Sequence, residues 1–194
     1  MRFAILQTNS IIGDVSRNLE NLERQIRSNA QRADLFISAE QALIGYPARD
    51  LLSQKWLLER EAAALESLRA LSGELNVGIL VGHCEARNGA GRPLYNSASL
   101  FDNGALIGRV RKRRIPSYDI FEEERFFEAW NGADPQPIEF RGTRLAVSIC
   151  EDGWDSILAF GVRDVRAYPK HARDNGNGAN ILINLSASPY AIEK

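Results

Sequence analysis

A cysteine ends an apolar segment of the sequence and is followed at once by two acidic residues. The segment covers residues 144–149, and Cys150, Glu151 and Asp152 come directly after it. A thiol at the end of a buried strand lies at the mouth of a sheet, where reactive side chains can meet a ligand. The chain has only two histidines, so few residues could act as the histidine base that commonly pairs with a catalytic cysteine. If Cys150 is a nucleophile, another side chain must act as its base.

A carboxyl group stands in a similar position earlier in the chain. Glu40 follows residues 34–39, an apolar segment that predicts a buried strand. One interpretation of Glu40 is a solvated carboxylate that opens a loop. The other is a desolvated carboxyl group, whose pKa is raised toward the range of a working base.

The third candidate, Lys112, lies within the basic run 109–114. Alternate side chains of a strand share a face, so Lys112 is predicted on an apolar face with Leu106, Gly108 and Val110. The arginines of the run fall on the opposite face, which favours a solvated or salt-bridged surface over nucleic-acid binding. A lysine at the edge of an apolar site can stabilise an oxyanion without help from histidine.

The second cysteine, Cys84, is weighed against Cys150 because it is also followed by an acidic residue, Glu85. His83 is its neighbour, but adjacent residues of a strand face opposite ways, so His83 is not placed to activate it. Buried cysteines usually act as small apolar side chains. Cys150 is therefore the preferred nucleophile.

Composition narrows the class of protein. A chain of 194 residues with 44% hydrophobic residues predicts one domain with an ample core. The net charge of -1 gives no general attraction to nucleic acid or to an anionic membrane. The N-terminus is too weakly apolar for a signal peptide, and no stretch approaches the roughly 20 apolar residues of a membrane helix. Two cysteines indicate a reducing compartment, so a cytoplasmic location is expected.

Strand and helix patterns alternate along the chain. The predicted helices cover residues 14–33, with Asp14 or Ser16 as N-cap, and 51–75. The predicted strands cover residues 3–7, 34–39, 77–82, 96–101, 105–112, 144–150 and 180–185, and Asp102-Asn103-Gly104 predicts a hairpin turn. This order favours a layered α/β protein with a mixed sheet, and residues 173–178 favour a surface loop. The sequence ends soon after a strand with no helix to cover it, as expected for a fragment.

Several motifs together resemble the nitrilase, or carbon–nitrogen hydrolase, superfamily. More closely, they are similar to the glutamine-amidase domain of glutamine-dependent NAD synthetases. They lie at residues 40–52, 111–127, 150–154 and 184–190, and the likeness runs from the first strand to the last residue. Ala39 and Gln41 depart from the proline and leucine usual in the family, and residues 155–177 form a longer connection than in many relatives.

The resemblance implies a four-layer αββα sandwich and a catalytic triad of Glu40, Lys112 and Cys150, with Glu123 in support. It further implies substrate-binding roles, assigned to Tyr46, Tyr118, Glu151 and Ser188. Residues 1–194 would form a single domain that is incomplete at its C-terminal end, because family members continue for several more elements. No metal site is predicted.

The same likeness implies partners and cofactors. The expected ligand is a small amide, glutamine, and the chain is expected to form a homo-oligomer. The amidase reaction needs no cofactor; ATP and Mg²⁺ belong to a synthetase domain, which is absent because no glycine-rich phosphate motif follows a strand. That NAD synthetase domain would be carried elsewhere.

The expected chemistry is amide hydrolysis through a thioester. Glu40 would remove the thiol proton of Cys150, while the Lys112 ammonium and the Glu151 N–H stabilise the oxyanion. Lys112 is also expected to favour the thiolate, because a nearby cation lowers a cysteine pKa. Three functions remain open: glutamine hydrolysis that supplies ammonia for NAD synthesis, a stand-alone amidase acting on another small carboxamide, and a truncated, non-catalytic assembly fragment.

Overall fold

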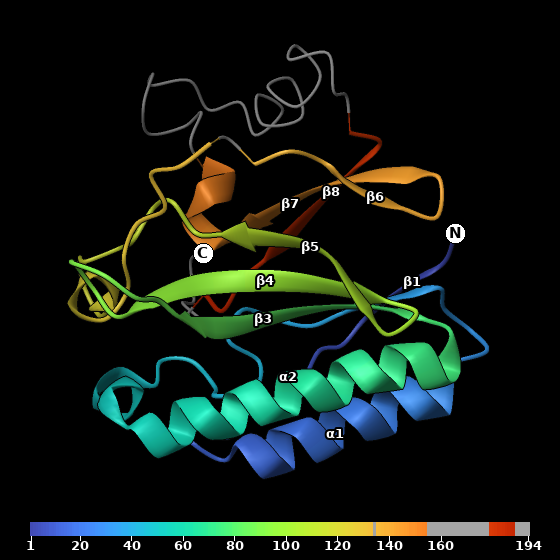
Figure 1. The fold of residues 1–194 in the computed structure, drawn as a ribbon, viewed down its shortest axis with the longest axis horizontal. Coiled ribbons are helices and arrows are strands. Elements are labelled where there is room, and N and C mark those ends of the chain that lie inside the picture. Colours follow the sequence, from blue (N-terminus) through green and yellow to red (C-terminus); the bar gives the residue numbers. More distant parts are fainter. Residues whose placement is uncertain (134, 155–178, 189–194) are drawn as a thin grey trace.

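The structure is a computed structural model that describes residues 1–133, 135–154 and 179–188. Two helices lie side by side along one face of a five-stranded sheet, and a three-stranded sheet covers the other face (Figure 1). The helices are α1 (Val15–Asn29) and α2 (Lys55–Leu75). Three short 3₁₀ helices, η1 (Arg49–Ser53), η2 (Glu123–Arg125) and η3 (Cys150–Trp154), connect the layers in the part of the chain that is described.

The five-stranded sheet is mixed, as the sequence predicts. Its strands lie in the order of the chain, with β1, β2 and β3 parallel and β3, β4 and β5 antiparallel. The strands are β1 (Phe3–Ile5), β2 (Leu35–Ile37), β3 (Gly78–Ala86), β4 (Leu94–Asp102) and β5 (Ala105–Arg111).

The second sheet contains the strand that leads to Cys150. It consists of β6 (Ile138–Phe140), β7 (Thr143–Ile149) and β8 (Ile181–Leu185), in that order. β6 pairs antiparallel with β7, and β8 pairs parallel with β7. The sequence patterns predict β7 and β8 but miss β6, which is only three residues long.

Local signals place most elements correctly. Asp14 is the N-cap of α1, and its carboxylate accepts a hydrogen bond from the Arg17 N–H (3.1 Å). The hairpin turn has positive φ at Asn103 (48°) and Gly104 (74°), as a tight two-residue turn requires. β3 continues past its predicted end at Gly82 to Ala86, because β4 pairs with it along this whole length.

The core forms two clusters, one on each side of the five-stranded sheet. Strand alternation divides β2 between them, because Leu35 and Ile37 pack between the sheets whereas Phe36 packs toward the helices. Gly108 allows the two sheets to approach closely, since a Cβ atom there would come within 2.6 Å of the Ile138 side chain. The sandwich therefore depends on a glycine at this point of β5.

Three of the four expected layers lie within the described ranges: the layer of α1 and α2, the five-stranded sheet and the three-stranded sheet. Helices cover the five-stranded sheet, and the predictions for residues 155–177 and for the loop 173–178 fall outside the described residues. Neither of the two described α-helices is long and apolar enough to cross a membrane.

A buried carboxyl group joins α2 to β3. Glu61 is 1% exposed, and its Oε2 atom accepts a hydrogen bond from the Cys84 N–H (3.1 Å). Its Oε1 atom has no partner among the residues described. Burial raises the pKa of Glu61 to about 8, so the carboxyl group is protonated at neutral pH.

This burial predicts a pH-dependent stability that Glu61→Gln removes. In the unfolded chain Glu61 ionises near its usual pKa of 4.5, whereas in the folded protein it keeps its proton to about pH 8. Its stabilising contribution is therefore complete at low pH and is lost as the pH rises through this window. Relative to Glu61→Gln, we expect the parent's free energy of unfolding to fall by up to about 1.4 kcal/mol per pH unit. Denaturant unfolding of both proteins across the window measures this difference, and parallel pH curves would contradict the expectation.

Candidate active site

Glu40 lies where the chain crosses β3 after leaving β2. The crossing passes over Gly82, where a Cβ atom would come within 2.5 Å of the Ala39 carbonyl oxygen and 2.8 Å of the Glu40 Cα. A side chain at residue 82 would therefore push the Glu40 segment away from the sheet. Glu40 is 2% exposed, so the interpretation as a solvated loop carboxylate is wrong.

Lys112 lies directly after β5 and continues its hydrogen bonding. Its N–H donates to the Asn96 carbonyl (2.8 Å), and its own carbonyl accepts from the Trp130 N–H (3.0 Å). The side chain is fully buried, and its Nζ atom donates to Glu40 Oε1 at 2.8 Å and to both carboxylate oxygens of Glu123 at 2.9 Å. Burial lowers the pKa of Lys112, but Glu40 and Glu123 outweigh this effect and raise it above its ordinary value.

A β-bulge decides which way Lys112 points. Phe101 pairs with Leu106 but Leu100 pairs with Gly108, so Ile107 is left over and the register shifts by one residue. The predicted grouping of Leu106 with Gly108 and Lys112 is therefore wrong, and Leu106 is 44% exposed. From Gly108 onward the alternation holds, and it directs Lys112 toward the second sheet.

The arginines of the basic run form the salt-bridged face that the sequence favours. Arg109 and Arg111 both bind the Glu85 carboxylate, at 2.8 Å and 2.6 Å. Arg111 also lies 4.9 Å from the ring centroid of Tyr95 and 4.7 Å from that of Trp130. Burial opposes ionisation of Glu85, but these arginines and a neighbouring serine lower its pKa to about 2. Together these contacts hold Arg111, the residue before Lys112, in place.

Asn96 is a buried residue of the site that the sequence analysis misses. Its Nδ2 atom donates to Glu40 Oε1 (2.7 Å) and, over a longer distance, to Glu123 Oε2 (3.4 Å). The side chain is fully buried. Counting residue pairs from the hairpin turn would place Tyr95 opposite Lys112; the bulge moves Asn96 into that place. The hairpin turn alone therefore does not reveal that Asn96 lies opposite Lys112.

Cys150 ends β7 in a sharp turn and begins η3. Its φ of 48° lies in the left-handed region that few side chains adopt, and its carbonyl accepts from Asn184 Nδ2 (3.1 Å). The thiol is 7% exposed. Burial and the charge of Glu40 raise its pKa, whereas Lys112 and a hydrogen bond with Ser186 lower it. Lys112 thus acts in the expected direction, but the net effect is a raised pKa, so the thiol keeps its proton at rest.

Glu123 completes the charged cluster from η2. It is 4% exposed, and its Oε1 atom accepts a hydrogen bond from the Tyr46 hydroxyl (3.0 Å). Burial raises the pKa of Glu123, Lys112 lowers it, and the charge of Glu40 raises it again, with a net rise. Two carboxyl groups thus share one ammonium.

Backbone contacts draw two further segments to this cluster. Glu40 Oε2 accepts a hydrogen bond from the Ala187 N–H (3.0 Å), which ties the chain after β8 to the site. Asp152, next but one to Cys150, accepts from the N–H groups of Arg113 (3.1 Å) and Arg114 (2.8 Å). The turn after the thiol is therefore bound to the chain after Lys112. Burial raises the pKa of Asp152 to about 6.

The predicted substrate-binding residues differ in how closely they approach the thiol. Tyr46 contacts Glu123, as described above. Tyr118 is half exposed, and its pKa is raised by burial first and then by the charges of Glu151 and Cys150. Ser188 is exposed, and its Oγ lies 3.0 Å from the Oγ of Ser186, a residue that hydrogen-bonds the Cys150 thiol. Their roles in binding stay predictions.

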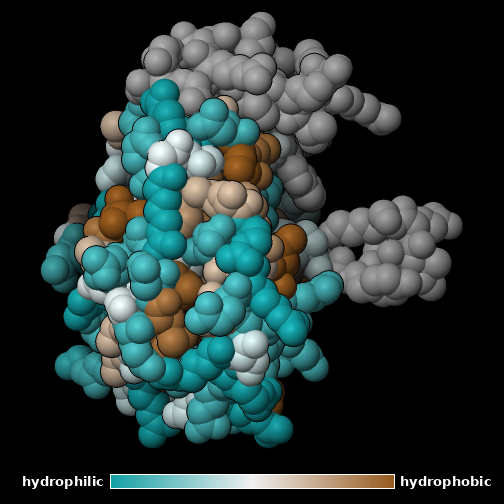
Figure 2. All heavy atoms as spheres, turned by 90° about the vertical axis from the view of Figure 1, so that its right-hand side faces the viewer, coloured by the Kyte–Doolittle hydropathy of each residue, from teal (hydrophilic) through white to brown (hydrophobic). Residues whose placement is uncertain are grey.

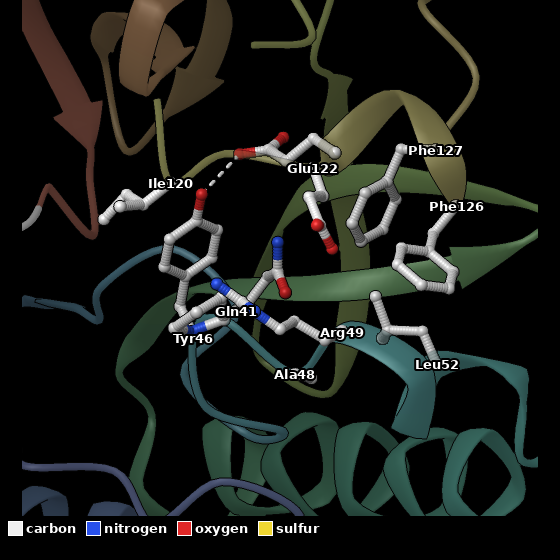
Figure 3. A pocket seen from close by; sticks show the side chains of 11 residues that line it. Gln41, Tyr46, Ala48, Arg49, Leu52, Ile120, Glu122, Phe126 and Phe127 are labelled. Carbon is white, nitrogen blue, oxygen red and sulfur yellow. Dashed lines mark hydrogen bonds between the residues drawn. The ribbon is translucent and has the colours of Figure 1, made fainter. Parts of the chain in front are cut away.

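A pocket opens beside the cluster (Figure 3). It encloses about 300 Å³ of space, including its open mouth, and Tyr46 and Glu123 form part of its wall. Gln41 lies at its centre, between Tyr46 on one side and Phe126 and Phe127 on the other. Cys150, Lys112 and Glu40 do not line it.

Residues 2–160 match the family model described as carbon-nitrogen hydrolase. The chain belongs to the carbon-nitrogen hydrolase family.

Its likeness to individual proteins covers nearly all of its length. It is 32% identical over 98% of its length to a glutamine-dependent NAD(+) synthetase from Synechocystis sp., of which it covers 34%. A second glutamine-dependent NAD(+) synthetase, from Thermotoga maritima, is 29% identical and 31% covered. The chain thus spans about a third of the length of the curated relatives it matches.

Solved structures confirm the fold. A glutamine-dependent NAD+ synthetase from Acinetobacter baumannii, in complex with ADP, superposes with a TM-score of 0.81 at 27% identity, over 98% of this chain and 33% of that chain. A mutant amidase from Nesterenkonia sp. AN1 superposes with a TM-score of 0.77 at 20% identity, over 99% of this chain and 67% of that chain. That mutant carries the acetamide moiety of fluoroacetamide at its active-site cysteine. The nitrilase-type α/β fold expected from the motifs is therefore confirmed.

The contacts of Asn96 predict that it orients the base. We expect Asn96→Ala to lower kcat for hydrolysis of a carboxamide by about 10- to 100-fold, because a hydrogen bond to a charged group contributes about 1.5–3 kcal/mol. Loss of the N–H donor also removes a hydrogen bond that stabilises the charged form of the Glu40 carboxylate. Since a base must be deprotonated to act, the acid limb of the pH–rate profile should move to higher pH. Steady-state kinetics across the pH range measure both effects.

Asn18→Ala is the matched control for this prediction. Asn18 is also buried, but its Nδ2 atom donates to the carbonyls of Ile11 and Leu43, both at 2.8 Å, away from the charged cluster. Its loss should lower stability and leave the acid limb unmoved. Identical acid limbs in the parent and in Asn96→Ala would show that Asn96 does not act on the base.

Proposed function

We propose that the chain hydrolyses glutamine to glutamate and ammonia, and that the ammonia supplies the conversion of deamido-NAD to NAD. One observation carries the chemistry: the buried contact of Lys112 with Glu40 and Glu123, beside a protonated cysteine. The choice of glutamine rests on the likeness to glutamine-dependent NAD synthetases.

In the first half-reaction, Glu40 takes the proton of the Cys150 thiol as sulfur attacks the carboxamide carbon. The negative charge that forms on the carbonyl oxygen is stabilised by the Lys112 ammonium and by the Glu151 N–H. Protonated Glu40 returns its proton to the departing nitrogen, the C–N bond breaks, and ammonia leaves a thioester on Cys150. No histidine is needed, because the carboxyl group carries the proton both ways.

In the second half-reaction, Glu40 removes a proton from water, which attacks the thioester carbon. The C–S bond then breaks, the thiolate takes the proton back, and glutamate is released. The raised pKa of Cys150 agrees with this sequence, since the resting thiol has a proton to give. The adduct at the active-site cysteine of the Nesterenkonia amidase supports a covalent intermediate by analogy.

A second candidate is a stand-alone amidase that acts on another small carboxamide. The structural likeness to the Nesterenkonia amidase, with a TM-score of 0.77, favours it. Relative rates on a panel of carboxamides and nitriles separate the two candidates, since a glutaminase prefers L-glutamine. If the chain releases ammonia from none of these compounds, the remaining candidate is the non-catalytic assembly fragment.

Replacement of the nucleophile tests the proposal directly. We expect Cys150→Ala to reduce release of ammonia from L-glutamine by about 10⁴-fold or more, since removal of a nucleophile abolishes the covalent route. A coupled ammonia assay measures the loss. Cys84→Ala is the matched control, because Cys84 is an equally buried cysteine in the core between α2 and β3. Release at the parent rate by Cys150→Ala would overturn the assignment.

A glutamine analogue with a diazo-ketone group gives an independent test of the same residue. We expect one adduct per chain in the intact mass of the parent and of Cys84→Ala, and none in Cys150→Ala. Both thiols are buried, but Cys150 lies beside the charges of Glu40 and Lys112, where the substrate carboxamide would bind, whereas Cys84 packs in the core on the helix side of the sheet. Absence of any adduct in the parent would favour the inert fragment.

A further inference from the structure

The thiol and the ammonium that the proposed reaction needs belong to different sheets. Cys150 directly follows β7 of the three-stranded sheet, and Lys112 directly follows β5 of the five-stranded sheet. At the end of the molecule with the β6–β7 turn, the sheets meet through apolar packing, since a Cβ atom at Gly78 would come within 2.5 Å of the Phe140 ring. Hydrophobic side chains also reach the surface on this side (Figure 2). Apolar packing has no preferred direction, so directional contacts are needed to fix the thiol relative to the ammonium.

Asp152 makes such directional contacts within two residues of both reactive groups. It lies two residues after Cys150, and its carboxylate accepts hydrogen bonds from the two residues that follow Lys112. The Arg113 N–H donates to Oδ1 at 3.1 Å and to Oδ2 at 3.2 Å, and the Arg114 N–H donates to Oδ1 at 2.8 Å. The Asp152 carboxylate therefore links the chain that follows one sheet to the chain that follows the other.

The Asp152 carboxylate is buried, which makes this link costly to form and strong once formed. The side chain is 8% exposed, and burial raises the pKa of the carboxyl group to about 6, although the two N–H groups and the charge of Lys112 lower it. At neutral pH the carboxyl group is therefore ionised. Hydrogen bonds to an ionised acceptor are roughly twice as strong as those between neutral groups.

The turn that carries the thiol needs support from its surroundings. Cys150 has a φ of 48°, a backbone conformation that persists only where neighbouring contacts enforce it. Asn184 of β8 supports the turn on one side, because its Nδ2 atom donates to the Cys150 carbonyl (3.1 Å) and a Cβ atom at Gly153 would overlap its amide. Asp152 ties the same turn to the chain after β5.

We propose that Asp152 is a positioning residue, which sets the distance between the Cys150 thiol and the Lys112 ammonium through its hydrogen bonds to the Arg113 and Arg114 N–H groups. This role rests on the proposed function, since it concerns the reaction of that thiol. Asp152 does not touch the substrate; it holds the turn so that the sulfur and the ammonium meet the same carboxamide. A displacement of about 1 Å can cost about 100-fold in rate, so the link controls kcat rather than substrate affinity.

Three substitutions separate position from charge. Asp152→Asn removes the charge but keeps the Oδ1 acceptor that both N–H groups use, so kcat for release of ammonia from L-glutamine should stay within about threefold of the parent. Asp152→Glu keeps the charge but lengthens the side chain by one methylene group, and Asp152→Ala removes the link. Both should lower kcat by about 10- to 100-fold and leave KM nearly unchanged. The reverse order, with Asp152→Asn impaired and Asp152→Glu at the parent rate, would overturn the proposal.

A second readout follows the thiol in the absence of substrate. In a Cys84→Ala background, the pH dependence of alkylation by iodoacetamide reports the pKa of Cys150 alone. The charge of Lys112 lowers this pKa, so a displaced ammonium should raise it. We expect a higher pKa in Asp152→Ala than in Asp152→Asn, and a higher pKa in Asp152→Glu than in the parent. Each pair has equal charge at residue 152, so a difference reflects position, and equal values in both pairs would overturn the proposal.

The Glu variant and a matched control separate this role from misfolding. If Asp152→Ala does not fold, the comparison of Asp152→Glu with the parent decides. Asp34→Asn is the control, because the Asp34 carboxylate also accepts a backbone N–H bond, from Arg2 at 2.6 Å, but at the start of β2, whereas Glu40 follows the end of that strand. Both kcat and the alkylation profile should stay at the parent values in Asp34→Asn.

The two readouts also separate this role from the proposed function. If the parent releases no ammonia from glutamine but the alkylation profiles differ within the charge-matched pairs, the proposed function fails and the positioning role stands. If the parent hydrolyses glutamine and none of the three variants lowers kcat or shifts the profile, the positioning role fails and the proposed function stands.

Discussion

A single buried ammonium, held between two buried carboxyl groups, is the constraint on which the rest of this structure depends. Lys112, Glu40 and Glu123 are all at most 4% exposed. Transfer of such ions out of water costs several kcal/mol each, and only close pairing with further hydrogen bonds offsets the cost. Two carboxylates also carry more charge than one ammonium can balance, so the cluster needs additional hydrogen-bond donors. Asn96, Tyr46 and the Ala187 N–H supply them.

These donors come from distant parts of the chain, and backbone features bring them together. Gly82 lets the Glu40 segment lie against β3, and the bulge at Ile107 directs Lys112 toward the second sheet. Asp152 then binds the chain after Lys112 to the turn after Cys150. The sandwich of two sheets is therefore the means by which a lysine from one sheet meets a cysteine from the other.

The sequence predicts the parts of this arrangement that depend on local patterns. Periodicity locates both helices and most strands, and the strand ends locate Glu40 and Cys150, because an apolar run that stops at a polar residue is visible without coordinates. Leu106 and Asn96 mark where such reasoning fails. A bulge leaves no sequence signal in this hairpin, yet it changes the face of every residue on one side of it. Likewise, β6 is too short to show a period.

The pKa of Cys150 is hidden from the sequence for a different reason. A lysine near a cysteine suggests a thiolate, but burial and the charge of Glu40 act against it and prevail. The sign of such a shift depends on the balance of desolvation and charge, which only the assembled site fixes.

That balance also explains why the site holds two carboxyl groups. Were Cys150 ionised at rest, Glu40 would face a second negative charge across the same small volume, with one ammonium for three anions. Keeping the proton on sulfur until the substrate arrives limits the buried charge to what Lys112 and its neighbouring donors can stabilise. In the proposed reaction, Glu123 holds Lys112 in place while Glu40 gains and loses the proton, so the ammonium remains fixed as the charge around it changes. In that proposal one carboxyl group moves the proton, and the other keeps the cation where the oxyanion forms.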